Sequence, residues 1–233
     1  FPNMHIFSGS AHPEIAQEIA THLGMELGHI NLKKFSCGET YARITESIRG
    51  EEIYVIQSIS ENANDDYMEL FLIMDALKRA SAAAIHVVIP HFGYARQDKK
   101  SAPREPISSR LIADLLSAVG FDRLITMDLH ADQIQGFFSK PVDHLTALPM
   151  FSDYFTKKNL ENVVVVSPDT GSAKFAKRLA DRIGAELAIM HKTRPSHNVA
   201  EITNVVGNVK NKTCVILDDM VDTAGSVCSG IHA

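Results

Sequence analysis

Short apolar segments alternate with segments of helical length along the whole chain, and this alternation constrains the fold more than any other feature. Several apolar segments are almost unbroken runs of valine, isoleucine and leucine, which is typical of parallel strands buried on both faces. Strands are predicted at His5–Ser8, Glu52–Gln57, Ile85–Pro90, Arg123–Asp128, Asn162–Ser167, Glu186–Met190 and Thr213–Leu217. Helices are predicted at Pro13–Leu23, Asp65–Ala80, Ile107–Val119, Leu148–Lys158 and Ser172–Ile183. This order of elements indicates an α/β fold with mostly parallel sheets flanked by helices.

The chain also contains an internal repeat. A shift of 160 residues aligns identical residues without a gap over about 50 positions, among them Ala16 with Ala176, Gly24 with Gly184, Glu26 with Glu186 and Val55 with Val215. Two unrelated strand–helix–strand units would share the pattern of elements, but we favour duplication because no gap is needed. We therefore predict two similar halves, residues 1–147 and 148–233.

The second copy is shorter than the first. The first copy continues past Ser60, whereas the second ends at Ala233, which corresponds to Ile73 in the middle of a helix. We therefore expect the second half to be incomplete, with about 80 residues of its copy lying outside this sequence.

Composition excludes several classes of protein. The net charge of −5 provides no basic field for nucleic acid, so any anion must be held by a local site. The three cysteines are far apart and lack zinc-ligand spacing, which favours a reducing compartment. No apolar run approaches the ~20 residues of a membrane span, and the first residues do not resemble a signal peptide. We expect a cytoplasmic protein without a membrane or nucleic-acid partner.

The strongest local motif is the segment from Val215 to Ser226, in which an apolar strand is followed by two acids and a turn of small residues. Backbone N–H groups at a helix start can hold a phosphate, so Thr223, Ala224, Gly225 and Ser226 predict a phosphate site. The acids Asp218 and Asp219 can accept hydrogen bonds from a diol or bind a metal. The alternative is a strand end with an acidic cap.

Three further groups of residues are ambiguous without context. The basic residues Arg96 and Lys99 could hold a polyphosphate or form a solvated loop. Lys192 and Arg194 begin the segment Lys192–Lys212, which is predicted to form a long polar loop and to act either as a lid or as a basic linker. The strand-end residues His130 and Asp169 are expected at the carboxyl edge of a sheet, where ligands bind in α/β proteins, although a histidine there is more often structural.

Taken together, these motifs resemble the class I ribose-phosphate pyrophosphokinases. The resemblance covers nearly the whole chain and follows the order and spacing of that family. A phosphoribosyltransferase would share only the last loop. The residues that carry the resemblance are Phe92–Lys100, Arg104–Ile107, Asp128–His130, Ser167–Asp169, Lys192–Pro195 and Val215–Ser226.

The resemblance implies two halves of phosphoribosyltransferase type and a function for each motif. It places the adenine of ATP on the loop of Phe35, Cys37, Gly38 and Glu39, and further ATP contacts at Arg96, Gln97 and Lys99. The family usually has an acid or amide where this chain has Cys37, and a threonine where it has Ser226; a backbone contact would survive the first change, and the serine hydroxyl keeps the donor. Magnesium is implied at His130 and Asp169, and transition-state stabilisation at Lys192 and Arg194.

At the other substrate, the resemblance implies that ribose 5-phosphate is bound by Arg194, Asp218, Asp219, Asp222, Thr223, Ala224, Gly225 and Ser226. It also implies activation by phosphate and inhibition by ADP near Ser47 and Arg49, for which a plain hairpin turn is the alternative. The implied assembly is a homohexamer built from dimers, with ATP sites shared between subunits.

The implied reaction transfers the diphosphoryl group of ATP to ribose 5-phosphate for nucleotide biosynthesis. Two alternatives stay open at this point. A phosphoribosyltransferase would use the same phosphate loop but consume phosphoribosyl diphosphate. A catalytically silent regulatory paralogue would bind the same ligands without turnover, although the presence of Lys192, Arg194, His130 and Asp169 argues against it.

Overall fold

A computed structural model of the chain describes residues 3–196, 199–222, 224, 225, 227 and 228; for residues 192–196 and 199–203 it describes the backbone only. The chain divides into two compact units, Phe1–Leu145 and Thr146–Ala233, and each is described by itself.

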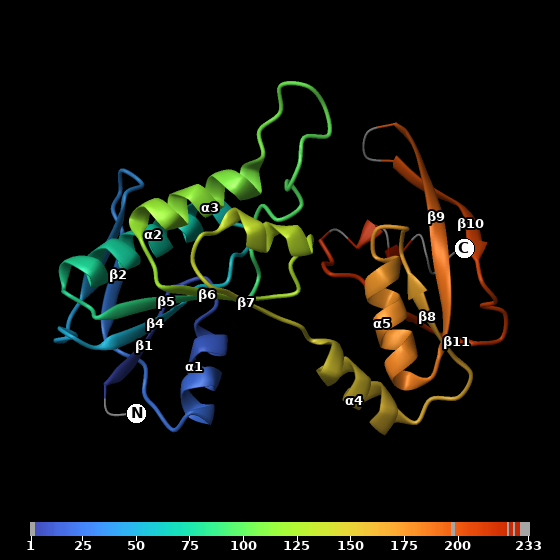
Figure 1. The fold of residues 1–233 in the computed structure, drawn as a ribbon, viewed down its shortest axis with the longest axis horizontal. Coiled ribbons are helices and arrows are strands. Elements are labelled where there is room, and N and C mark those ends of the chain that lie inside the picture. Colours follow the sequence, from blue (N-terminus) through green and yellow to red (C-terminus); the bar gives the residue numbers. More distant parts are fainter. Residues whose placement is uncertain (1–2, 197–198, 223, 226, 229–233) are drawn as a thin grey trace. The chain divides into compact units, whose positions relative to one another are not determined.

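The first unit is built on a five-stranded sheet with the order β1-β4-β5-β6-β7 (Figure 1). All its neighbouring strands are parallel. Its strands are β1 (Met4–Ser8), β4 (Glu52–Ile56), β5 (Ala84–Ile89), β6 (Arg123–Met127) and β7 (Val142–Leu145). Its helices are α1 (Pro13–His22), α2 (Ala63–Arg79), α3 (Ser108–Val119) and the 3₁₀ helix η1 (Asp132–Phe137).

Helices cover both faces of this sheet, with α2 and α3 on one side and α1 on the other (Figure 1). Successive residues of β4 divide between the two sides. Ile53 and Val55 belong to the large core that includes α2, whereas Ile56 packs with Ala16 and Ala20 of α1. Burial on both faces explains why the strands are nearly continuous apolar runs.

An antiparallel hairpin of β2 (Ile30–Lys34) and β3 (Thr40–Ile44) extends from the first unit. The sequence analysis did not predict these strands. They are partly exposed and carry lysine and asparagine, so they lack the apolar run by which the buried strands are recognised.

The second unit contains a sheet with the order β10-β9-β8-β11 and two helices. Its strands are β8 (Val163–Ser167), β9 (Glu186–Ser196), β10 (Val199–Val206) and β11 (Thr213–Ile216), and its helices are α4 (Leu148–Lys158) and α5 (Ala173–Ile183). β8 runs parallel to both β9 and β11, and β10 is antiparallel to β9.

The prediction that Lys192–Lys212 forms a long loop is wrong. β9 continues through Lys192 and Arg194, and β10 returns along it. The sequence analysis missed β10 and the second part of β9 because this arm is polar and only part of it contacts the core. Val205 packs against the buried cluster of β8 and β9, whereas Val206 is 60% exposed.

The internal repeat is visible in the order of the elements. Adding 160 to the residue numbers carries β1 onto β8, α1 onto α5, the β2–β3 hairpin onto the β9–β10 arm, and β4 onto β11. Gly184 ends α5 in the left-handed conformation, with a φ of 67°, and Gly24 has nearly the same φ, 65°, just after α1. The predicted α/β class with two similar halves is confirmed.

Candidate functional site

The carboxyl edge of the second sheet brings two of the predicted acids together. Asp169 follows β8 by two residues, and Asp218 follows β11 by two residues. β8 and β11 are parallel neighbours, with Val166 opposite Ile216. The parallel pairing therefore delivers both loops to one edge of the sheet, as expected for a ligand site in this kind of fold.

Ser172 connects these two loops. Its hydroxyl donates to Asp218 Oδ1 over 3.1 Å, and its backbone N–H donates to Asp169 Oδ1 over 2.9 Å. The backbone N–H of Asp219 donates to the same Asp218 Oδ1 over 2.9 Å. Two donors thus hold one oxygen of Asp218, and its second oxygen takes part in neither bond.

The environment of Asp218 favours its neutral form more than water does. Burial is the main cause, followed by the adjacent Asp219 carboxyl, and together they raise the pKa of Asp218 from 3.8 to about 6. The hydrogen bonds from the Asp219 amide and from Ser172 act in the opposite direction. Such a carboxyl pair gains by accepting hydrogen bonds from a diol or by meeting a cation.

Of the predicted ribose-phosphate residues after Asp219, the structure describes Asp222, Ala224 and Gly225, while Thr223 and Ser226 lie outside the described residues. Asp222 and Gly225 are exposed. A helix begins at Gly225, because the N–H of Cys228 donates to the carbonyl of Ala224 over 2.8 Å. The expected helix start is therefore present behind the two acids, as a phosphate site of this kind requires.

Lys192 and Arg194 lie in β9, and Lys192 pairs with Ile202 of β10. Their side chains lie outside what the structure describes. The predicted catalytic function of both residues stays a prediction.

In the first unit, the predicted adenine loop forms the tip of the β2–β3 hairpin. The N–H of Phe35 donates to the carbonyl of Glu39 over 2.8 Å, and Cys37, Gly38 and Glu39 are exposed. The ring of Phe35 is 43% exposed, with the Lys33 ammonium 5.0 Å from its centre. An exposed ring supported by a neighbouring cation can stack on a planar base.

Arg96, Gln97 and Lys99 lie in the loop between β5 and α3. Gln97 is fastened to the start of α3, since its Oε1 accepts from the Ser108 hydroxyl over 2.6 Å and its carbonyl from the Ser109 N–H over 3.1 Å. Arg96 and Lys99 are exposed. The loop therefore presents two cations on a fixed base, which suits an anionic ligand.

The same turn of α2 anchors both of these loops. Lys34, at the end of β2, forms an ion pair of 2.6 Å with Asp65. The hydroxyl of Tyr94, in the β5–α3 loop, donates to Asn64. The hairpin and the basic loop are thus positioned by one element.

His130 is exposed and lies just after β6, at the carboxyl edge of the first sheet. Asp169 belongs to the second unit, so the expected magnesium pair of His130 and Asp169 stays a prediction. In the described part of the chain, no three histidine, cysteine or acidic side chains converge as a metal site. The carboxylate of Asp169 suits a hard cation that is shared with phosphate oxygens, whereas an imidazole suits it less.

Ser47 and Arg49, the predicted regulatory residues, are exposed on the connection between β3 and β4. Gly50 turns this connection with a φ of 77°. Because β3 and β4 lie in different sheets, the segment is a crossover turn and not a hairpin.

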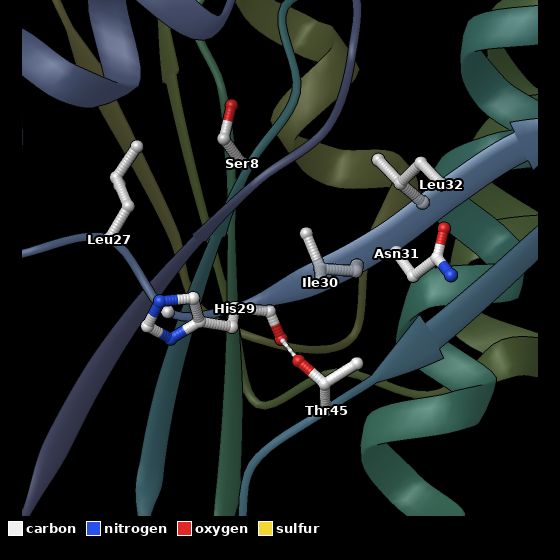
Figure 2. Close-up of a pocket in the computed structure, with 8 residues that line it drawn as sticks. Ser8, Leu27, His29, Ile30, Asn31, Leu32 and Thr45 are labelled. Atoms are coloured by element: carbon white, nitrogen blue, oxygen red, sulfur yellow. Dashed lines mark hydrogen bonds between the residues drawn. The ribbon is translucent and has the colours of Figure 1, made fainter.

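A hollow of about 500 Å³ lies between β1 and the start of the hairpin (Figure 2). The Thr45 hydroxyl donates to the carbonyl of His29 over 3.0 Å at its rim. None of the predicted site residues lines it; its walls are Ser8, Leu27, Gly28, His29, Ile30, Asn31, Leu32 and Thr45.

Comparison with known proteins identifies the family. Residues 4–120 match the N-terminal domain of ribose phosphate pyrophosphokinase, and residues 149–233 match the phosphoribosyl transferase domain. The chain is 51% identical to the ribose-phosphate pyrophosphokinase of Bacillus subtilis, over 99% of the chain and 73% of the relative. The chain belongs to the ribose-phosphate pyrophosphokinase family.

Other members of the family agree with this assignment. The ribose-phosphate pyrophosphokinase of Fusobacterium nucleatum is 49% identical, over the whole chain and 74% of the relative. The crystal structure of phosphoribosylpyrophosphate synthetase from Mycobacterium smegmatis matches with a TM-score of 0.92 and 44% identity, covering 99% of this chain and 76% of that one. The chain thus spans about three quarters of the length of these relatives. Among the residues that the structure describes, no helix is both long and apolar enough to cross a membrane.

The sequence analysis did not single out Ser172, which connects the two loops of the candidate site. It treated Ser172 only as the first residue of a helix, which is the usual place for a serine. The signal that could have found it is its position three residues after Asp169, in a loop that faces the end of a neighbouring parallel strand.

Proposed function

We propose that the chain transfers the diphosphoryl group of ATP to the anomeric hydroxyl of ribose 5-phosphate. The products are 5-phosphoribosyl 1-diphosphate, for nucleotide biosynthesis, and AMP. The observation that carries the proposal is the pair of Asp218 and Asp219 at the sheet edge, followed by a helix start at Gly225, in a chain of this family.

At the ribose end, Asp218 and Asp219 accept hydrogen bonds from the ribose hydroxyls. The loop of Asp222, Thr223, Ala224, Gly225 and Ser226 holds the 5-phosphate, with Arg194 as a further phosphate contact. The raised pKa of Asp218 supports this assignment, because a half-buried acid beside another acid gains from two hydroxyl donors.

At the ATP end, Phe35 stacks on adenine and Glu39 accepts from its exocyclic amine. Gly38 and the backbone of Cys37 complete the adenine loop. Arg96 and Lys99 bind the phosphates, and Gln97 contacts the nucleotide from its fixed place at the start of α3. Exposure of Phe35, Arg96 and Lys99 supports these functions.

The chemical step is a displacement at the β-phosphorus of ATP. The anomeric oxygen forms the new P–O bond, the bond to AMP breaks, and the hydroxyl proton is lost to solvent or to a base. Lys192 and Arg194 offset the negative charge that grows on the bridging oxygen. Asp169 and His130 are the residues that would hold magnesium by the family resemblance, and the ion would supply charge neutralisation when bound.

Four further properties belong to the same proposal and rest on the family. Phosphate activates at Ser47 and Arg49. The chain assembles as a homohexamer of dimers that share ATP sites. The protein works in the cytoplasm. The family domains meet between residues 147 and 148, two residues beyond the division between the compact units.

The test is AMP formation by the purified chain with ATP, ribose 5-phosphate, magnesium and phosphate. We expect AMP only when ribose 5-phosphate is present. Release of diphosphate from phosphoribosyl diphosphate in the presence of a nucleobase would instead identify a phosphoribosyltransferase. Binding of both substrates without AMP formation would identify a silent paralogue.

A further inference from the structure

Ser172 stands at the N-cap of α5 but does not cap it. An N-cap serine ordinarily accepts a hydrogen bond from an N–H of the first helical turn, which stabilises the helix. The side chain of Ser172 makes no such bond. Its hydroxyl donates instead across 46 residues of sequence, to Asp218 Oδ1.

The backbone N–H of Ser172 also bonds to a residue of the candidate site. It donates to Asp169 Oδ1 over 2.9 Å. The carbonyl of Asp169 in turn accepts from the hydroxyl of Ser167, which is fully buried at the end of β8. A continuous chain of hydrogen bonds thus runs from β8 through Asp169 and Ser172 to Asp218.

The first unit contains an internal reference for this arrangement. His12 is the repeat counterpart of Ser172, and Ser58 is the counterpart of Asp218. The His12 ring accepts from the N–H of Ile15, as an N-cap side chain usually does. In the first unit, which has Ser58 in place of an acid, the N-cap residue His12 bonds to its own helix. In the second unit, the N-cap residue Ser172 bonds to Asp218 instead.

We propose that Ser172 is a positioning residue for ribose binding, which holds Asp218 so that its second oxygen faces the ribose hydroxyls. The proposal rests on the proposed function of Asp218. The Ser172 hydroxyl and the Asp219 N–H both bond to Oδ1, so they fix the rotation of the carboxylate, and neither of these two bonds uses Oδ2. The neighbouring Asp219 carboxyl also interacts with the Asp218 carboxyl, so the two acids form one paired acceptor for a diol. Without the hydroxyl, one fixed donor is lost and the carboxylate can rotate.

The test compares steady-state kinetics of the chain with those of Ser172→Ala and Ser172→Thr. We expect Ser172→Ala to raise the KM for ribose 5-phosphate about tenfold, because a hydrogen bond to a charged group is lost. The KM for ATP should change less than about twofold, within the spread of such measurements. Ser172→Thr keeps the hydroxyl and should restore most of the affinity.

Two controls make the result decisive. Thr170→Ala removes an exposed hydroxyl from the same loop and should leave both KM values unchanged. Asp218→Asn tests the function on which the inference rests. If Asp218→Asn weakens ribose 5-phosphate binding and Ser172→Ala does not, the inference about Ser172 is wrong. If neither variant weakens it, the proposed function of Asp218 is wrong.

A general loss of folding would give a different pattern. Thermal unfolding of Ser172→Ala and Ser172→Thr should begin at nearly the same temperature as that of the unchanged chain, because Ser172 does not cap α5. A lower melting temperature for Ser172→Ala, with equal losses for both substrates and no rescue by Ser172→Thr, would overturn the positioning function.

Discussion

The loops after β1 and β8 are equivalent in the internal repeat, but their polar groups have different hydrogen-bond partners. The loop after β8 carries Asp169 and Ser172 and faces a second acid. The loop after β1 is closed by its own chain: Glu69 of α2, only 8% exposed, accepts from the N–H of Ser10 over 2.7 Å and from its hydroxyl over 2.9 and 2.8 Å. A carboxylate of the protein therefore occupies the donors of this loop.

Gln57 completes the closure of the first loop. Its Oε1 accepts from the N–H of Ala11 over 3.2 Å, and its Nε2 donates to Glu69 over 2.9 Å. Leu217 stands at the equivalent place in the second unit and offers no such bonds. The comparison teaches that one of two equivalent loops can be closed by side chains of its own unit, while the other is built around acids that suit a ligand.

The first unit nevertheless contributes to the proposed ATP site, through other elements. Its candidate residues lie on the β2–β3 hairpin and on the β5–α3 loop. Within the first unit, the closed loop after β1 is therefore structural, whereas the proposed nucleotide-binding residues lie on other elements.

The largest effect is expected from Lys192, whose repeat counterpart is the uncharged Leu32. Lys192→Ala should lower kcat about 10²–10³-fold, by analogy with the loss of a single transition-state donor. The measurement is initial-rate kinetics at saturating substrates. Lys177→Ala, in the exposed ion pair with Asp181, is the matched control and should keep kcat. An unchanged kcat for Lys192→Ala would remove Lys192 from the mechanism.

Glu69 gives the largest expected effect on stability. Glu69→Ala leaves the Ser10 N–H and the buried Gln57 amide without their acceptor and opens a cavity, which should cost about 3 kcal/mol of unfolding free energy. Urea unfolding measures this change. Asp75→Ala, on an exposed part of the same helix, should change the free energy little. Equal effects of the two variants would contradict closure of the loop by Glu69.

Gly9 should tolerate no side chain, because a Cβ there would lie 2.1 Å from Gln57 Oε1. Gly9→Ala should therefore displace Gln57 and cost about 2 kcal/mol, a typical cost of overpacking. Gly136→Ala is the control, since nothing lies within 4 Å of a Cβ at that position. The two variants can be compared by the same urea titration, and equal midpoints would show that Gln57 does not fill the loop.

The smallest expected effect is on the pH dependence of stability, and it involves Asp218 in the loop after β11. The pKa of Asp218 is about 6 in the folded chain against 3.8 as its ordinary value, so the folded state holds the proton more tightly. The stability that the folded chain gains by binding this proton at Asp218 is therefore full below pH 3.8 and is lost as the pH rises through about 6. Asp218→Asn should remove this dependence. Allowing for solvent screening of a half-exposed group, the melting-temperature difference between chain and variant should change by about 2 °C.

Melting temperatures of the chain and of Asp218→Asn should be recorded from pH 4 to pH 8. Parallel curves over that range would mean that the pKa of Asp218 is not raised. Ser58→Ala, at the equivalent place in the first unit, serves as the reference without an acid.

The sequence could predict the parts of the fold that are buried. The β8 strand and the α2 helix follow from apolar runs and helical periodicity, and parallel topology predicts that Asp169 lies at the carboxyl edge of a sheet. The β2–β3 hairpin and β10 were missed because partly exposed polar strands lack that pattern. Glu69 and Gln57 carry no signal either, since a buried polar residue in a helix or at a strand end is indistinguishable from a surface residue until its partners are known.

The closure of the loop after β1 also limits which mutations this loop can accept. Gln57, Glu69 and Gly9 depend on one another, since Gln57 fills the space beside Gly9 and shares its amide with Glu69. A mutation that reverses one of them leaves the other two unmatched, so each single step back costs stability. The closed loop can therefore be opened without a loss of stability only if several of these residues change together, so the three positions constrain one another as a group.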